Sequence, residues 1–375
     1  MNKVINILLS CFLLLDSIYG YFQKYNFGYG YVFQFLKLVL ISLLFYKNFR
    51  KRLSSNIYLI IVLIYFIFGT GLVYLFDFKY SLKNYFEMIN LSLKFIGGPL
   101  LYFFIKNSNY FTVKKIERIL ILNYIVCILN FGLYFFNLGY PQYAATNTGG
   151  RGYFFSGNEI SITFLILSVS LLTISHINKI IIFINLVSCY ILSTKTILLG
   201  FLIVFCSDFY KKIKKWNSYI VIIIFSSLFF YVNNQHEINL INHYKELASK
   251  TDFTSFLLSN RNRYVYELLK NYSNINVYEY LFGLRLNKTI EMDCFDIIIN
   301  YGFIGIVLIY VYYAYLLYIV FKNKKNDFKI KSLDVLIILF VSNLTGHFTF
   351  SSMAQIFFAL VNVYYYKKFQ EGSKI

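Results

Sequence analysis

Long apolar runs constrain this chain more than any other feature of its sequence. Residues 57–76, 119–138 and 295–321 each reach the length of about 20 residues that a helix needs to cross the hydrocarbon core of a bilayer. Hydrophobic residues make up 58% of the 375 residues, which is more than a soluble domain of this length carries. The sequence therefore predicts an all-α, polytopic integral membrane protein with a single membrane domain over residues 1–375.

Apolar runs separated by short connectors continue along nearly the whole chain. The hydropathy pattern predicts about 12 transmembrane helices. They cover residues 4–19, 31–46, 57–76, 86–105, 119–138, 160–177, 180–192, 196–210, 216–232, 295–321, 333–346 and 353–366. The first run lacks a small-residue cleavage site, so we expect it to remain as a span and not to be removed as a signal peptide. Residues 233–293 form the one long stretch that a bilayer would reject, and we predict a large extracytoplasmic loop there, between spans 9 and 10.

The basic residues give the chain a formal net charge of +19, and their positions predict its orientation. They cluster at residues 47–56, 106–118, 176–179, 211–215 and 322–331 and in the tail from Lys367. These segments alternate with less basic ones, and basic connectors remain on the cytoplasmic side of a membrane. We therefore expect both termini to be cytoplasmic and residues 233–293 to lie outside. This pattern explains the charge without a nucleic-acid partner.

An outer segment at residues 139–159, GYPQYAATNTGGRGYFFSGNE, contains the first candidate site residue. Its glycines and its proline predict irregular backbone. Arg151 is its only basic residue, and the flanking glycines allow a ligand to approach the backbone closely. Arg151 is therefore a candidate ligand-binding cation or an ordinary solvated arginine. Glu159 stands where the next helix begins, a position that suits helix capping as well as catalysis.

Two further basic residues are candidates on the same side. Lys195, in LSTKT, lies at the outer mouth of two closely spaced spans, where a lysine either binds a ligand or extends to the interface. In the large loop, a helix is predicted over about residues 260–272. Arg261 shares the apolar stripe of that helix with Tyr264 and Val265, whereas Arg263 faces water. An inward arginine needs an anionic partner, which is either a protein carboxylate or a phosphate.

Acidic residues and a histidine mark the membrane face of the later spans. Glu291 and Asp293 precede span 10, where carboxylates are costly and often functional. The alternative is an ion pair with Arg261 or Arg285. His347 ends span 11 in LTGHFTFSS, and it is a candidate base or proton carrier, or an interfacial hydrogen-bonding residue.

Four charged residues within the early spans are expected to form structural ion pairs. Asp16 and Lys37 lie near the outer ends of the first two spans and should pair with each other. Lys94 and Glu87 share one helix face and should pair similarly. The five cysteines show neither metal-ligand spacing nor a disulfide framework, and we expect no metal and no cofactor.

The order of these motifs resembles that of the Wzy-type O-antigen and capsular polysaccharide polymerases, within the O-antigen ligase-like superfamily. The resemblance covers about residues 151–375 and rests on GRGYFFSGNE, LSTKT, SNR, LFGLRL, EMDCFDIIINYGFIGIVL and GHFTFSS. The family shows an arginine-bearing loop, a basic residue in a Ser/Thr motif, a large outer loop, an LFG-x-G turn, and an acidic residue leading into yGiiG. This chain departs from the pattern with Leu284 and Arg285 after the LFG turn, and with Lys195 where arginine is common.

The resemblance implies a membrane glycosyltransferase that polymerises oligosaccharide repeat units carried on polyprenyl (undecaprenyl) diphosphate. The reaction would take place on the outer face of the bacterial cytoplasmic membrane and yield a surface polysaccharide. As diphosphate ligands the resemblance implies Arg151, Arg261 and Lys195, whose cationic groups match phosphate oxygens. As catalytic groups it implies His347, Glu291 and Asp293, with His347 or else Glu291 accepting the proton of the acceptor hydroxyl.

The implied partners are the lipid-linked oligosaccharide, membrane lipid, a chain-length regulator and a flippase. Two other classes of protein remain open. A ligase that transfers finished polymer to another acceptor shares almost every motif. A flippase or transporter of lipid-linked sugar would also be polytopic, but internal repeats and charges deep in several spans are expected of it.

Overall fold

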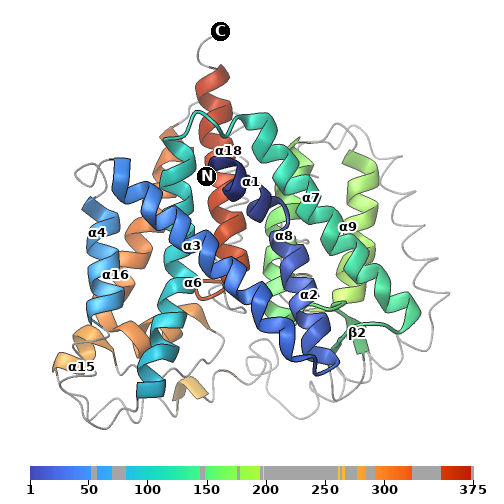
Figure 1. Ribbon diagram of the computed structural model, residues 1–375, viewed down its shortest axis with the longest axis horizontal. Coiled ribbons are helices and arrows are strands. Elements are labelled where there is room, and N and C mark those ends of the chain that lie inside the picture. The colour runs from blue at the N-terminus through green and yellow to red at the C-terminus, as the bar shows by residue number, and fades with distance from the viewer. Residues whose placement is uncertain are drawn as a thin grey trace.

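The computed structural model of the protein describes residues 1–51, 57–69, 82–143, 148–174, 178–194, 197, 261, 264–266, 277–283, 292–322 and 348–372. Helices account for 85% of these residues. Figure 1 shows α6 and α18 in the middle of the assembly, α4, α15 and α16 on one side of them, and α7, α8 and α9 on the other, while α3 crosses in front. The prediction of a helical protein is therefore confirmed for the described part of the chain.

The helices differ widely in length. In chain order they are α1 (Asn2–Ser10), α2 (Phe12–Lys24), α3 (Tyr31–Lys51), α4 (Ile57–Leu63), α6 (Leu82–Lys106), α7 (Val113–Gly132), α8 (Gly157–Ile174), α9 (Asn178–Leu192), α15 (Val277–Phe282), α16 (Asp293–Lys322) and α18 (Ser352–Gly372). A short 3-10 turn, η1 (Gly28–Gly30), precedes α3. A π-helical turn, η3 (Ile64–Phe68), follows α4, and a second 3-10 turn, η4 (Leu133–Phe136), follows α7.

Several helices are long and apolar enough to cross a membrane. Within the described residues there are four, at Gly28–Arg50, Tyr85–Lys106, Val113–Phe136 and Asp293–Ile319, and a fifth if the bent pair α1 and α2 is one span. Of the twelve predicted spans, those at residues 196–210, 216–232 and 333–346 lie outside the described residues, as does most of the predicted loop at 233–293. The described helices thus indicate a helical protein with at least four potential membrane spans.

The first predicted span is broken where the sequence predicted one continuous helix. α1 and α2 meet at Cys11 with a bend of 56°. The Asn123 side chain of α7 enters the break, donating from Nδ2 to the Leu9 carbonyl oxygen at 2.9 Å and accepting from the Leu13 N–H at 3.0 Å. These two backbone groups would otherwise pair within a helix, so the inserted amide explains the bend.

The span predicted at residues 295–321 is also interrupted, at Gly302. Its φ of 60° and ψ of −165° lie outside the helical region. Gly302 packs against the turn that follows α15, where Gly283 has a φ of 82°. A Cβ on Gly302 would lie 2.5 Å from the Gly283 nitrogen and 2.5 Å from the Leu281 oxygen. The tight turn expected at Gly283 is therefore confirmed, and it packs on the glycine of the later YGFIG stretch.

The segment before α8, predicted to lie outside, forms a small hairpin, although the sequence predicted irregular backbone and an all-α fold. Strand β1 (Pro141–Tyr143) pairs antiparallel with β2 (Thr148–Gly150), with Pro141 opposite Gly150. Proline is tolerated at the first position of such a strand, because it need not donate to the ladder there. The Arg151 N–H continues the pairing by donating to the Tyr140 carbonyl oxygen at 3.1 Å.

α18 packs closely against α6 across a glycine. A Cβ on Gly98 would lie 2.9 Å from Gln355 Oε1 and 3.2 Å from the Gln355 carbonyl oxygen. Small residues allow helix backbones to approach in this way. The Gln355 amide in turn donates to the Tyr313 hydroxyl of α16 at 2.8 Å. α18 therefore links α6 and α16 in the centre of the assembly.

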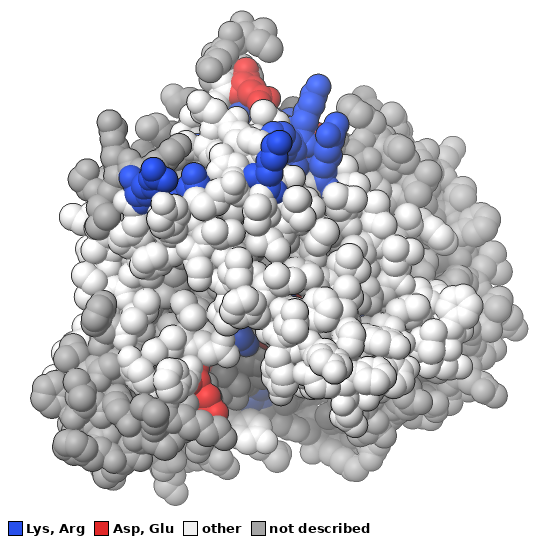
Figure 2. Space-filling model, in the orientation of Figure 1, with Lys and Arg blue, Asp and Glu red and all other residues white. Residues whose placement is uncertain are grey.

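Basic residues gather at one end of the assembly. Lys106 at the end of α6 donates to the Tyr315 hydroxyl of α16 at 2.7 Å, and Lys367 near the end of α18 donates to the Ser108 carbonyl oxygen at 2.7 Å. Figure 2 shows the basic side chains of the visible face at this end, and a hollow nearer the other end in which charged side chains are visible. The described parts of two predicted inner segments, residues 106–118 and the tail from Lys367, thus share one side, as the charge pattern predicted.

The contact between the two glycines predicts a loss of stability for Gly302→Ala. A positive φ costs a non-glycine residue about 1–3 kcal/mol, and the added Cβ also overlaps backbone atoms. We expect the variant to melt several degrees lower than wild type when thermal aggregation is followed by size-exclusion chromatography in detergent. The control is Gly132→Ala, because Gly132 has a helical φ of −59° and nothing lies within 4 Å of an added Cβ. Equal melting of the two variants would contradict the packing at Gly302.

Candidate functional site

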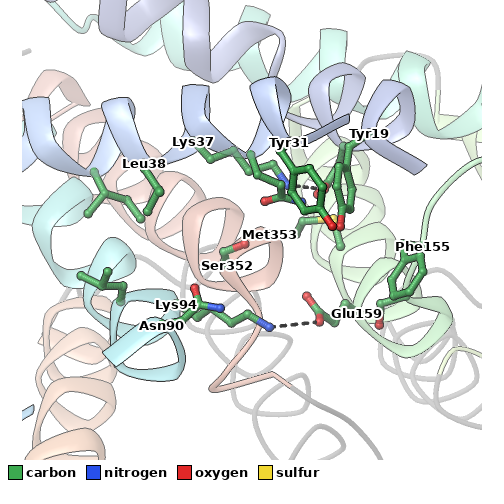
Figure 3. A pocket seen from close by; sticks show the side chains of 15 residues that line it. Tyr19, Tyr31, Lys37, Leu38, Asn90, Lys94, Phe155, Glu159, Ser352 and Met353 are labelled. Atoms are coloured by element: carbon green, nitrogen blue, oxygen red, sulfur yellow. Dashed lines mark hydrogen bonds and ion pairs between the residues drawn. The ribbon is translucent and has the colours of Figure 1, made fainter. Parts of the chain in front are cut away.

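A cavity of about 360 Å³ opens between helices that lie far apart in the sequence. Its wall is formed by α2, α3, α6, the first turn of α8 with the residues before it, and the start of α18. The lining residues are Asp16, Tyr19, Tyr31, Gln34, Lys37, Leu38, Ile41, Asn90, Leu93, Lys94, Phe155, Ser156, Glu159, Ser352 and Met353. Figure 3 shows the labelled side chains around this space.

Two ion pairs line the cavity. Lys37 of α3 donates to Asp16 of α2, so the expected pair between the first two helices is confirmed. Lys94 Nζ of α6 lies 3.8 Å from Glu159 Oε1 of α8. The Lys94 partner is therefore Glu159 and not Glu87, the residue expected from helical spacing. α8 supplies the nearer carboxylate because Glu159, in its first turn, faces Lys94 across the cavity, which local spacing cannot reveal.

Glu159 is fixed from a third direction as well. It occupies the first turn of α8, where the helix dipole favours negative charge. The Ser351 hydroxyl, at the start of α18, donates to Glu159 Oε2 at 2.8 Å. The same hydroxyl oxygen accepts from the Ala354 N–H at 3.2 Å and caps α18. Glu159 thus joins three helices at the cavity wall.

Arg151 lies beside the cavity without lining it. Its guanidinium lies 5.3 Å from the centre of the Tyr140 ring, and that ring contacts Phe155 edge-on at 6.2 Å between centroids. Phe155 itself lines the cavity. Burial lowers the pKa of the Arg151 guanidinium, although the nearby Tyr140 raises it. Within the described part of the chain, no carboxylate pairs with Arg151, and its Nε is buried without a hydrogen-bond partner.

A second cation approaches the same tyrosine from α2. Lys24 donates to the Gly139 carbonyl oxygen, and its ammonium group lies 5.8 Å from the Tyr140 ring centre and 5.9 Å from that of Tyr153. The Tyr140 hydroxyl donates to the Gly20 carbonyl oxygen at 3.1 Å. These contacts attach the hairpin segment to the C-terminal end of α2, and Lys24 and Arg151 therefore lie near each other there.

Asp293 occupies a different environment from the one predicted for a catalytic carboxylate. Its side chain is fully buried at the start of α16. Its Oδ2 accepts from the Phe348 N–H at 3.0 Å, the Thr349 N–H at 2.9 Å and the Thr349 hydroxyl at 3.2 Å. It does not line the cavity. A carboxylate that accepts this many protein hydrogen bonds holds the chain in place, and here it holds the residues that follow His347 in sequence.

The other predicted site residues are described only in part. Lys195, Glu291 and His347 lie outside the described residues. Arg261 is half-buried and helical, as predicted, and Tyr264, expected on the same inward stripe, is 59% exposed. The structure therefore places Arg151 beside the cavity and assigns Asp293 a buried anchoring position.

Sequence reasoning interpreted Asp16, Lys37 and Lys94 only as members of structural ion pairs, and Glu159 as a helix-capping or catalytic residue. The signal for a site was present, because a lysine in the middle of an apolar helix is a functional candidate by default. Lys94 has this position in α6. Among the described residues no group of three or more histidine, cysteine, aspartate or glutamate side chains could hold a metal ion. Comparisons of the chain with protein-family models, curated proteins and solved structures found no match.

The Asp293 contacts predict that Asp293→Asn is destabilised. The amide retains one acceptor but places a donor against backbone N–H groups, and hydrogen bonds to a charged group contribute about 1.5–3 kcal/mol. We expect a lower thermal midpoint in detergent than for Glu371→Gln, a control at an exposed acidic residue near the end of α18. A variant that melts like wild type but has lost activity would instead support a catalytic Asp293.

Proposed function

We propose that this protein is a membrane glycosyltransferase that polymerises polyprenyl-diphosphate-linked oligosaccharide units into a surface polysaccharide. The motif order from residue 151 onward supports the proposal. Two of those motifs also meet in space, since Gly283 of LFGLRL packs against Gly302 of the YGFIG stretch. Asp293, from the acidic motif, binds backbone and side-chain groups of the GHFTFSS segment. The motifs thus behave as one structural unit.

The observation that carries the proposal is the position of Arg151. A half-buried guanidinium is costly without an anionic partner, and no carboxylate supplies one within the described part of the chain. Its five N–H donors suit the oxygens of a diphosphate. Lys24 adds positive charge at the same tyrosine. We propose that Arg151 binds the donor diphosphate, with Arg261 and Lys195 assisting, and stabilises the negative charge that develops as the diphosphate leaves.

The base in this scheme is His347 or Glu291. His347 is preferred because its unperturbed pKa of about 6.5 lies near working pH. The backbone immediately after it is held by Asp293, and the hydroxyl of Ser351 is bound to Glu159. We propose that Asp293 acts as a positioning residue for the histidine segment. The basic end of the assembly would face the bacterial cytoplasm, and the cavity end would face outward.

A lipid-linked oligosaccharide transporter is the second candidate function. The ion pairs Asp16–Lys37 and Lys94–Glu159 supply charge within apolar helices, a feature expected of transporters. A ligase shares the motifs but acts on finished polymer. The three classes differ in what accumulates when the gene is removed.

Deletion of the gene should cause single repeat units to accumulate on lipid and polymer to disappear. Complementation with wild type should restore the polymer, whereas Arg151→Ala should slow polymer formation by about ten to a hundredfold, because it removes hydrogen bonds to the leaving diphosphate. Arg151→Lys should also be poor, since lysine lacks the paired donors. The measurement is gel and mass-spectrometric analysis of extracted glycans.

The control for this experiment is Arg118→Ala, an exposed arginine at the start of α7. Equal polymer from Arg118→Ala and Arg151→Ala, at equal protein levels, would contradict the assignment of Arg151. Long unattached polymer in the deletion strain would indicate a ligase. Repeat units retained on the inner leaflet would indicate a transporter, and unchanged polymer would exclude all three.

The proposed orientation predicts which introduced cysteines react in intact cells. On a background that lacks the five native cysteines, Gly28→Cys should react with an impermeant maleimide, because residue 28 is exposed at the cavity end. Lys114→Cys, exposed at the basic end, should react only after the membrane is opened. The opposite labelling pattern would invert the topology and place the proposed site in the cytoplasm.

A further inference from the structure

The cavity between α2, α3, α6, α8 and α18 has the features of a binding site in its own right. It combines about 360 Å³ of space with four charged residues and several uncharged polar groups. Small-molecule sites in proteins have volumes of about 300–1,000 Å³ and contain a few convergent polar groups. The cavity is thus large enough for a small ligand, and the chemistry of its lining residues indicates the class of that ligand.

The charges of the cavity are balanced. Its two lysines pair with its two carboxylates, as Lys37 with Asp16 and Lys94 with Glu159. A site for a free phosphate or diphosphate needs an excess of positive charge, which the ion pairs remove here. The cavity therefore suits a ligand, or part of a ligand, without net charge.

The uncharged lining groups have unused hydrogen-bonding capacity. Within the described part of the chain, the amides of Gln34 and Asn90 and the hydroxyls of Tyr19 and Tyr31 form no hydrogen bond, and Asp16 Oδ2 is buried without a partner. Amides donate and accept, and carboxylates accept only. Such a mixture matches the hydroxyl groups of a polyol, each of which both donates and accepts.

Aromatic rings complete the wall. Figure 3 shows Tyr19 and Tyr31 side by side, and Phe155 contacts Tyr19 edge-on with 6.4 Å between the ring centroids. Aromatic side chains present an apolar face, and tyrosine adds a polar tip. The apolar C–H face of a sugar ring packs against such a surface while its hydroxyls reach the amides and carboxylates.

We infer that the cavity binds a sugar ring of the lipid-linked saccharide. Phe155 lines the cavity and contacts Tyr140, and Tyr140 in turn faces Arg151. The cavity and Arg151, the residue proposed to bind the diphosphate, therefore share one aromatic wall. This placement favours the ring nearest the diphosphate. The inference rests on the proposed function for the identity of the ligand, but its test requires no turnover. In this arrangement Asn90, Gln34 and Glu159 determine which sugar is accepted.

Saturation-transfer difference NMR tests the inference with purified protein in nanodiscs. The probe is a mixture of free glucose, galactose, mannose, rhamnose, N-acetylglucosamine and N-acetylgalactosamine at millimolar concentration. We expect saturation transfer to at least one of these sugars. Tyr31→Leu and Asn90→Leu should weaken its apparent affinity by about tenfold, the effect of losing stacking or a hydrogen bond. Both residues are exposed at the cavity, so the fold should tolerate the changes.

The matched control is Tyr29→Leu. Tyr29 is 76% exposed and Tyr31 is 69% exposed, but only Tyr31 lines the cavity. Absence of transfer to every sugar, or equal transfer with Tyr29→Leu and Tyr31→Leu, would overturn the inference. A further overturning result would come from ³¹P NMR of inorganic diphosphate. If the wild-type protein broadens the diphosphate signal and Tyr31→Leu abolishes the broadening, the cavity binds an anion and not a neutral sugar ring. Cavity-dependent sugar binding together with unchanged polymer in the deletion strain would support the sugar site and refute the three functions considered above.

Discussion

Polar groups inside an apolar helical assembly must find partners within the protein, and this requirement organises the structure. Water is not available there to hydrogen-bond a free backbone group or to solvate a charge. The break between α1 and α2 exposes the Leu9 oxygen and the Leu13 nitrogen, and Asn123 of a third helix satisfies both. Buried Asp293 is likewise satisfied by the backbone N–H groups of Phe348 and Thr349, just before α18. Each polar contact therefore fixes one helix against another.

The cavity shows where the same requirement leaves capacity for a ligand. Its charges are paired across helices, but several amides, hydroxyls and one carboxylate oxygen keep unused donors and acceptors. Arg151 shows the complementary case, a cation beside the cavity with no carboxylate partner among the described residues. A neutral ring in the cavity and an anionic group at Arg151 would satisfy both sets of groups. A sugar diphosphate has these two parts joined together.

The contact between Gly283 and Gly302 gives a structural role to two short sequence motifs, LFGLRL and YGFIG, each of which is a weak signal in the sequence alone. Gly283 and Gly302 have positive φ values and pack backbone to backbone, which a side chain at either position would prevent. Asp293, only nine residues before Gly302 in sequence, anchors the segment that leads into α18. The turn that follows α15 and the segment that leads into α18 are thus attached to the same short stretch of α16. This attachment is the basis of the positioning role proposed for Asp293.

The sequence by itself determined the helical class, the locations of the described apolar helices and the collection of basic residues at one end. These follow from hydropathy and charge, which are local properties summed along each helix. It also predicted the Asp16–Lys37 pair and the turn at Gly283. Only the tertiary structure decided that Lys94 faces Glu159, that Asn123 breaks the first span and that Gly302 interrupts α16. These outcomes depend on how separate elements pack against one another, which hydropathy and charge along a single helix do not determine.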